Sequence, residues 1–267
     1  MQDLDAQAPV LTQLDDDGVL LITLNRPKKK NAFNDPQWDG LRDALNEARE
    51  DDRVAVVVIT GAGKDFSAGQ DLTVFGGAAE PREDGKPNGY HACMQALHAF
   101  DKPLLAAAKG VGVGIGITLL FACDVVYVGE SVRLRLPFTS LGLVPEAASS
   151  YLLQAAIGRQ RAAELFFTAE WIDAARAVET GIAARSFADD ALLDCTLVKA
   201  KEIARWPVSS LRATKRTLMA PNRQAIQAAL AAEDQGMAEQ AGSPANIEAV
   251  TAFLQKREPD FKKLRQD

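Results

Sequence analysis

One glycine-rich segment, Gly61 to Asp71, directly follows the apolar run Val54 to Thr60 and contains groups that could stabilise negative charge. A strand that opens into a glycine-rich turn leaves backbone N–H groups unpaired, and such groups bind a phosphate or a developing oxyanion. The same residue types are also typical of a tight surface turn. Taken alone, the segment therefore leaves anion binding and a purely structural turn both open.

A second glycine-rich segment, Lys109 to Thr118, also follows a short apolar run. Alternating glycines let a ligand or another backbone approach the main chain closely. The G-x-G-x-x-G pattern of a dinucleotide-binding loop cannot be placed, because its third glycine would fall on Ile115, Ile117 or Leu119. The Gly-Lys-Ser/Thr of a phosphate-binding loop is absent as well. Close helix–sheet packing explains these glycines as well as a ligand site does.

A third segment, Pro137 to Ser150, carries a glutamate among apolar neighbours. Glu146 follows a proline and stands near Leu141, Leu143 and Val144. Apolar surroundings raise the pKa of a carboxyl group and make its ionised form a better general base. A glutamate at the start of a helix, stabilised by the helix dipole, is the alternative, and the residue type alone favours it.

The composition limits what else the chain could do. Its 267 residues include 30 Lys plus Arg and 36 Asp plus Glu, and the net charge of −6 argues against a nucleic-acid binder. The two histidines and three widely spaced cysteines form no zinc or disulfide pattern. We therefore expect chemistry that uses carboxylates and backbone groups, with no metal and no separate cofactor.

The ends and the apolar runs indicate where the protein works. The polar, acidic start Met1 to Pro9 lacks the features of a secretory leader. The longest apolar run, Val111 to Ala122, is far shorter than the roughly 20 residues that a membrane-spanning helix needs. We expect a cytoplasmic protein that binds neither membrane nor nucleic acid.

Alternating strands and helices must position the three segments. Val19 to Leu24 is expected to pair in a hairpin with Leu11 to Leu14, and Asn34-Asp35-Pro36 to begin a helix. The continuous apolar run Val54 to Thr60 is typical of a parallel strand covered on both faces. Further strands are expected at Pro103 to Ala108 and Val125 to Val128, and helices over Arg159 to Thr168, Asp173 to Thr180, Ala191 to Trp206, Ser209 to Met219, Arg223 to Met237 and Ala245 to Gln255. The fold class is α/β, with a core over residues 1–200 and a helical region over 201–267.

In order and spacing, several segments resemble the crotonase (enoyl-CoA hydratase/isomerase) superfamily, and the resemblance covers essentially the whole chain. They are Leu24 to Phe33, Phe66 to Leu72, Lys102-Pro103 with the glycines that follow, Cys123-Asp124, Pro137 to Ser150 and Phe253 to Phe261. The resemblance implies a crotonase-like ββα spiral core that binds an acyl-CoA thioester, the coenzyme A being part of the substrate. It also implies assembly into homotrimers or hexamers through the helical 201–267 region.

The same resemblance assigns roles to individual residues. It implies an oxyanion hole formed by the N–H groups of Ala68 and Ile115, which would stabilise an enolate as it develops. The two glutamates of the family's hydratases are replaced by Thr118 and Phe138, which cannot act as general bases. Glu146 stands where the family's Δ3,Δ2-enoyl-CoA isomerases carry their catalytic glutamate, so the resemblance favours a one-glutamate isomerase.

The substrate-binding residues follow from the same motifs. The resemblance places the coenzyme A portion against residues of the first two segments and the oxyanion hole, which are Lys30, Ala32, Ala68, Gly69, Gln70, Asp71, Leu72 and Gly114. The alternatives are another crotonase activity (an atypical hydratase, a thioester hydrolase or a ring-cleaving enzyme) and a non-catalytic acyl-CoA-binding paralogue. A nicotinamide-dependent oxidoreductase ranks lower because the glycine fingerprint fails.

Overall fold

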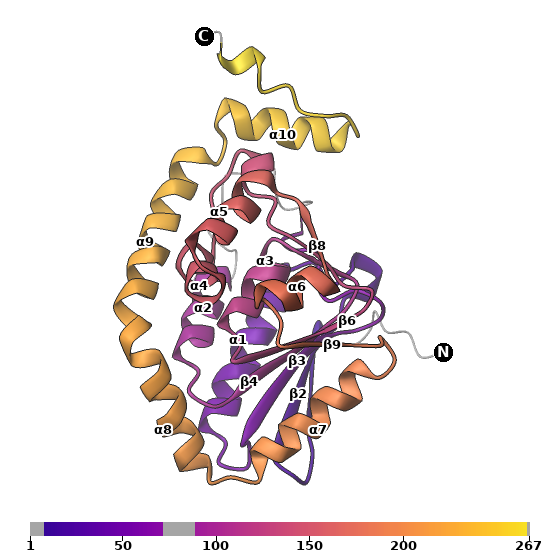
Figure 1. Ribbon diagram of the computed structural model, residues 1–267, viewed down its shortest axis with the longest axis vertical. Helices are drawn as coiled ribbons and strands as arrows, with labels where there is room; N and C mark the ends of the chain where they lie inside the picture. Colours follow the sequence, from indigo (N-terminus) through magenta and orange to yellow (C-terminus); the bar gives the residue numbers. More distant parts are fainter. Residues whose placement is uncertain (1–7, 72–88, 266–267) are drawn as a thin grey trace.

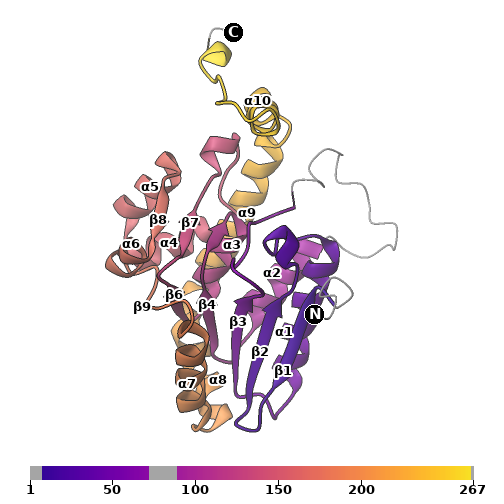
Figure 2. The same ribbon diagram turned by 90° about the vertical axis from the view of Figure 1, so that its right-hand side faces the viewer.

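A six-stranded sheet organises the molecule. The computed structural model describes residues 8–71 and 89–265. Strands β1 and β2 form an antiparallel hairpin, and every other neighbouring pair in the sheet is parallel (Figure 2). In spatial order the strands are β1 (Val10–Leu14), β2 (Val19–Leu24), β3 (Val56–Gly61), β4 (Leu104–Ala108), β6 (Val125–Gly129) and β9 (Arg185–Phe187).

Strand β3 is buried on both faces, as its continuous apolar run predicted. Val57 and Ile59 belong to the main core, which they share with residues of α1 (Asp35–Glu50) and α2 (Gly89–Ala99). Val56 and Val58 pack in a second cluster on the opposite face, where α7 (Leu192–Ala204) covers the sheet. Because helices cover both faces, the strand needs no polar side.

A small second sheet was not predicted. It contains β5 (Val111–Val113), β7 (Arg133–Arg135) and β8 (Trp171–Asp173), and α3 (Ile115–Thr118) follows β5 after a single residue. Three-residue strands carry too little alternation to be recognised. The guanidinium of Arg133 lies 4.5 Å from the centre of the Trp171 ring, so this sheet is held partly by cation–π contact.

The second half of the chain is mainly helical, as expected. Figure 1 shows α8 and α9 along one side of the molecule and α10 at the end where the C-terminus lies. Among the described residues, no helix has both the length and the apolar character needed to cross a membrane. Besides α7, the helices of this half are α4 (Ser149–Ile157), α5 (Arg159–Thr168), α6 (Ala174–Thr180), α8 (Val208–Met219), α9 (Arg223–Gln240) and α10 (Pro244–Leu254). Short 3-10 turns occur along the whole described chain, at η2 (Pro27–Lys29), η4 (Leu119–Ala122), η5 (Thr139–Leu141), η6 (Ala220–Asn222) and η7 (Lys263–Arg265).

One buried asparagine joins the loop after β2 to the loop after β3. Asn31 has a left-handed φ of 54° and no solvent exposure. Its Oδ1 accepts from the Arg26 N–H at 2.9 Å, and its Nδ2 donates to the carbonyl oxygens of Ala62 (3.0 Å) and Asp65 (2.7 Å). The Asn31 side chain is therefore one of the links between the two loops.

Replacing this side chain should destabilise the protein strongly. Asn31→Ala leaves three backbone groups without their hydrogen-bond partner. A buried polar group that loses its partner lowers the free energy of unfolding by about 1–3 kcal/mol. With the left-handed φ, we expect a loss of about 3 kcal/mol and a fall in Tm of roughly 6–12 °C in thermal unfolding. Asn34→Ala, which removes one capping bond to the Gln37 N–H, is the matched control and should cost about 1 kcal/mol. Equal losses for both variants would contradict the role of Asn31.

Candidate active site

The first two glycine-rich segments lie against each other. The Ser67 N–H donates to the Val111 carbonyl at 2.9 Å, and the Val113 N–H donates to the Ser67 carbonyl at 3.0 Å. A Cβ on Gly69, whose φ is +95°, would stand 2.6 Å from the Val113 carbonyl oxygen and 3.9 Å from the Gly114 Cα. Only glycine permits this approach.

The prediction for Ala68 is corrected by its hydrogen bond. The Ala68 N–H donates to the Lys30 carbonyl oxygen at 2.8 Å, so it is already paired and is not open to a substrate. The next residues form a bridge with Phe33, whose N–H donates to the Gly69 carbonyl and whose carbonyl accepts from the Asp71 N–H. Among the described residues the Gln70 N–H has no acceptor. The donor that this segment offers is therefore Gln70.

The second predicted donor, Ile115, keeps an open amide. It is the first residue of α3, and no acceptor for its N–H is present in the part of the chain that the structure describes. Gly114 before it has φ 55° and ψ −123°, a conformation that only glycine adopts readily. A Cβ on Gly116 would stand 2.2 Å from the Ser67 carbonyl oxygen, which places the start of α3 directly against the Ser67–Gln70 segment.

The carboxyl group of Glu146 lies near Gly114, at the start of α3. Its Oε1 lies 3.9 Å from the position that a Cβ on Gly114 would occupy, one residue from the open Ile115 amide. The residue as a whole is half-buried. Burial first, and then the negative charge of Glu233, raise the pKa of Glu146 to about 7. The group is thus balanced between its acid and base forms near neutral pH.

Thr118 and Phe138 provide no second acid–base group. Both are buried, with exposures of 0% and 4%. The Thr118 hydroxyl has no hydrogen-bond partner among the described residues, and the Phe138 ring lies 6.4 Å from the Phe166 ring. Neither a threonine hydroxyl nor a phenylalanine ring exchanges protons near neutral pH. Of Glu146, Thr118 and Phe138, only Glu146 carries a group that can exchange a proton near neutral pH.

The peptide that follows Glu146 is held by residues that the sequence did not single out. Ala147 and Ala148 have left-handed φ angles of 61° and 59°, which cost about 1–2 kcal/mol per residue. The Ala147 N–H donates to the Tyr90 hydroxyl at 2.9 Å, and the Ala148 N–H donates to Glu233 at 2.7 Å. No local pattern could have identified Tyr90 or Glu233, because they come from distant helices.

Most of the predicted coenzyme A residues gather around the Phe33–Gln70 bridge. Arg26 forms an ion pair with Asp71 at 3.0 Å and donates a hydrogen bond to the Ala32 carbonyl. The Gln70 side chain accepts from the Trp38 indole at 3.1 Å. Lys30, which has a left-handed φ of 49°, is exposed beside them. Leu72 lies outside the described residues.

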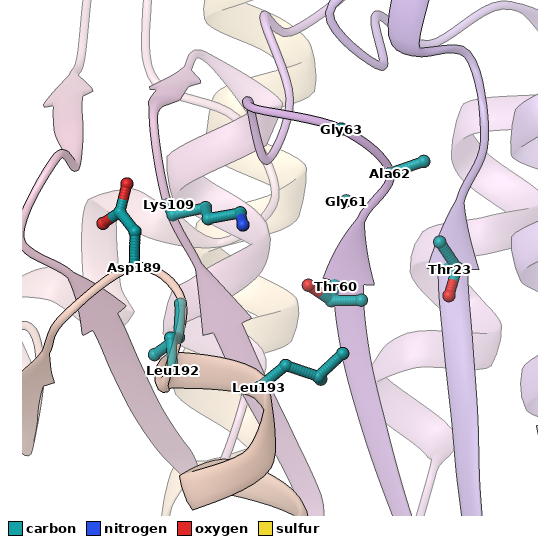
Figure 3. Close-up of a pocket in the computed structure, with 9 residues that line it drawn as sticks. All are labelled: Thr23, Thr60, Gly61, Ala62, Gly63, Lys109, Asp189, Leu192 and Leu193. Carbon is teal, nitrogen blue, oxygen red and sulfur yellow. The ribbon is translucent and has the colours of Figure 1, made fainter.

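Two clefts flank this region. The first, of about 270 Å³, lies at the carboxyl ends of β2, β3 and β4, and Figure 3 shows the Lys109 side chain extending toward the end of β3. Glu146, Gln70 and Ile115 are not among its described lining residues. The second, of about 300 Å³, adjoins the Glu146 loop through Pro145 and Ser150 and is otherwise lined largely by apolar side chains. In the described parts of the chain, no cluster of His, Cys, Asp or Glu could hold a metal ion.

Comparison with known proteins identifies relatives along almost the whole chain. A family model described as Enoyl-CoA hydratase/isomerase matches residues 15–265. The chain is 37% identical over 246 residues to the 2,3-dehydroadipyl-CoA hydratase of Escherichia coli, covering 91% of this chain and 95% of that protein. It is 31% identical over 243 residues to the rat enoyl-CoA delta isomerase 2, covering 90% of this chain and 62% of that protein.

The fold comparison agrees with the sequence comparison. A crystal structure of an enoyl-CoA hydratase/isomerase from Pseudoalteromonas atlantica superimposes with a TM-score of 0.89 at 35% identity. The match covers 95% of this chain and 99% of that one. The predicted α/β crotonase fold is thereby confirmed, and the chain belongs to the enoyl-CoA hydratase/isomerase family of the crotonase superfamily.

Proposed function

We propose that this crotonase-type acyl-CoA enzyme is an isomerase that shifts a double bond from 3-enoyl-CoA to 2-enoyl-CoA. The observation that carries the proposal is the single carboxylate of Glu146 beside Gly114, with a pKa of about 7, while buried Thr118 and Phe138 supply no second base. A proton shuttle needs one group that accepts and returns a proton, whereas hydration also needs water to be positioned and protonated.

The reaction divides between a side chain and two backbone groups. Ionised Glu146 removes a proton from C2 of the 3-enoyl thioester, and the electron pair moves into a dienolate whose charge reaches the thioester oxygen. The N–H groups of Gln70 and Ile115 donate to that oxygen; each such donor is typically worth about 3 kcal/mol. Protonated Glu146 then returns the proton to C4, which yields the 2-enoyl thioester and restores the base.

Binding of the coenzyme A portion is assigned to the segments around the Phe33–Gln70 bridge. Lys30 is an exposed cation there, and the bridge and its flanking hydrogen bonds bring Ala32 next to the Ala68–Asp71 segment. Gly114 leaves room for the thioester between this surface and Glu146. In the proposal, Ala68 contributes as part of this binding surface and as a structural link to Lys30, because its N–H is already paired.

The relatives carry both hydratase and isomerase names, so the decisive experiment compares the two reactions. Purified protein is assayed with 3-enoyl-CoA and 2-enoyl-CoA esters of several chain lengths. We expect conversion of the first without hydration of the second. Hydration without isomerisation would overturn the proposal and would indicate that another group activates water.

The raised pKa of Glu146 predicts a pH dependence. The base must be ionised to accept the C2 proton, and a raised pKa keeps it protonated up to higher pH than an ordinary carboxyl. We therefore expect kcat/KM to rise about tenfold per pH unit below pH 7 and to level off above about pH 7. A profile that stays flat between about pH 5 and 8 would contradict Glu146 as the base.

The helical 201–267 region is proposed to join copies of the chain. Its α10 exposes large apolar side chains, with Ile247 57%, Phe253 58% and Leu254 71% accessible. Burying such side chains in an interface is favourable. Light scattering of the purified protein should give the mass of a trimer or hexamer, and replacing Phe253 and Leu254 by serine should reduce that mass. A wild-type monomer would contradict the assembly.

A further inference from the structure

The strongest remaining feature is a buried charge on α9. Glu233 is 6% exposed, and no cation in the described parts of the chain forms an ion pair with it. Its Oε2 accepts from the Ala148 N–H at 2.7 Å, and its Oε1 accepts from the Ser150 N–H at 2.8 Å. The carboxylate thus caps the start of α4 from another helix, where a negative charge meets unpaired N–H groups and the positive end of the helix dipole.

Helix α9 contacts the chain both before and after Glu146. Ala147 and Ala148, directly after Glu146, are held in left-handed conformations that alanine adopts only under constraint. Three N–H groups of this stretch are bonded by side chains from elsewhere, two by Glu233 and one by Tyr90 of α2. On the other side, a Cβ on Gly236 would meet the Val144 side chain at 3.1 Å, so α9 also packs against the residues before Glu146.

We propose that Glu233 is a positioning residue for proton transfer: from α9 it fixes the two left-handed residues after Glu146 and thereby holds the Glu146 carboxyl group beside Gly114. This inference rests on the proposed role of Glu146 as the base. A second consequence concerns charge. The negative charge of Glu233 opposes ionisation of Glu146, so its removal should lower the pKa of Glu146.

Other titratable groups surround the pair and must be considered. Tyr90 and His98 approach the loop from α2, and Asp234 follows Glu233 on α9. Tyr151 on α4 donates its hydroxyl to Asn222 at 2.6 Å. Burial lowers the pKa of His98 to about 4 and raises that of Tyr90, so both stay neutral near pH 7. A difference between the acid limbs of wild type and a Glu233 variant is therefore assigned to Glu146, whose pKa is about 7.

The test is a pair of substitutions at one position. Glu233→Gln keeps the size of the side chain but removes its charge and leaves one oxygen to accept hydrogen bonds. We expect kcat to fall at least tenfold and KM to stay within twofold of wild type. The acid limb of the kcat/KM profile should move to lower pH. Glu233→Asp keeps the charge but is too short to reach both amides; we expect a similar loss of kcat with a much smaller shift of the limb. Asp234→Asn, a neighbouring substitution at a 56% exposed carboxylate, is the control and should change neither.

A direct measurement separates this inference from the proposed function. The Glu146 carboxyl is titrated by carbon NMR in the free protein, with Glu146→Gln identifying its signal. A lower pKa of Glu146 in the Glu233→Gln variant, together with the loss of kcat, supports the inference. If the titration of Glu146 and kcat are both unchanged in both Glu233 variants, the inference is overturned. If the wild type shows no isomerase activity, the proposed function fails, while the titration still decides whether Glu233 acts on Glu146. If Glu233→Gln does not fold, Glu233→Asp decides by its kcat alone.

Discussion

Glu146→Gln should abolish measurable isomerisation. The amide keeps the size of the side chain but cannot take up the C2 proton, and a positioned general base is worth about 10²–10⁴ in rate. Because the same group also returns the proton at C4, we expect kcat to fall by at least about 10³. The measurement is the initial rate with a 3-enoyl-CoA ester, at a pH above about 7, where wild-type Glu146 is ionised.

Binding provides the control for this variant. The coenzyme A portion is assigned to residues on the other side of the site, so the Kd of a non-reactive acyl-CoA analogue should change less than about threefold. Glu130→Gln, at an exposed glutamate that directly follows β6, should leave both rate and affinity unaltered. Turnover of Glu146→Gln at the wild-type rate would refute the assignment of the base.

Gly69→Ala should have the second largest effect, on both activity and stability. The new Cβ would stand 2.6 Å from the Val113 carbonyl oxygen, and the φ of +95° is unfavourable for alanine. The Ser67–Gln70 segment must then move away from β5 and α3, which displaces the Gln70 amide relative to the Ile115 amide. Since one oxyanion donor is worth about 10²–10³ in kcat, we expect a loss of that order and a lower Tm.

A second glycine separates the clash from the backbone strain. Gly158 has a similar φ of +83°, but a Cβ there would meet no atom within 4 Å. With ψ 153°, Gly158 lies in a region that essentially only glycine adopts, so Gly158→Ala should cost about 1–3 kcal/mol, or roughly 2–12 °C in Tm, and leave kcat within about twofold of wild type. Equal losses of kcat in the two variants would show that the contact with Val113 does not matter.

The sequence predicted the framework well because its signals are local. The continuous apolar run of β3 reflects helices on both faces, and the capping residue Asn34 with Pro36 marks the start of α1. The helices after residue 158 begin and end within a few residues of their predicted limits, since proline, glycine and apolar periodicity mark them. The short strands β5, β7, β8 and β9 lacked such signals.

The details of the site depend on contacts that no local pattern contains. Ala68 was predicted as a donor, but the left-handed Lys30 turns its carbonyl toward the Ala68 N–H and pairs it. The open amide is two residues further on, at Gln70. In the same way, no glycine in the sequence marks the left-handed conformations of Ala147 and Ala148. Tertiary hydrogen bonds to Tyr90 and Glu233 hold these two alanines in that conformation.

The large separation in sequence between Glu233 and the residues that it binds has a consequence for folding during synthesis. Its bonds to Ala148 and Ser150 span 85 and 83 residues of chain. During synthesis, all strands of the main sheet, which end at Phe187, leave the ribosome before α9 does. A nascent chain can thus assemble its sheet while the peptide after Glu146 still lacks its acceptor, and contacts between such distant residues form late in folding. The peptide after Glu146 can therefore take its final conformation only once α9 has been made, so that chains stopped before α9 would carry the sheet without the acceptor that holds this peptide.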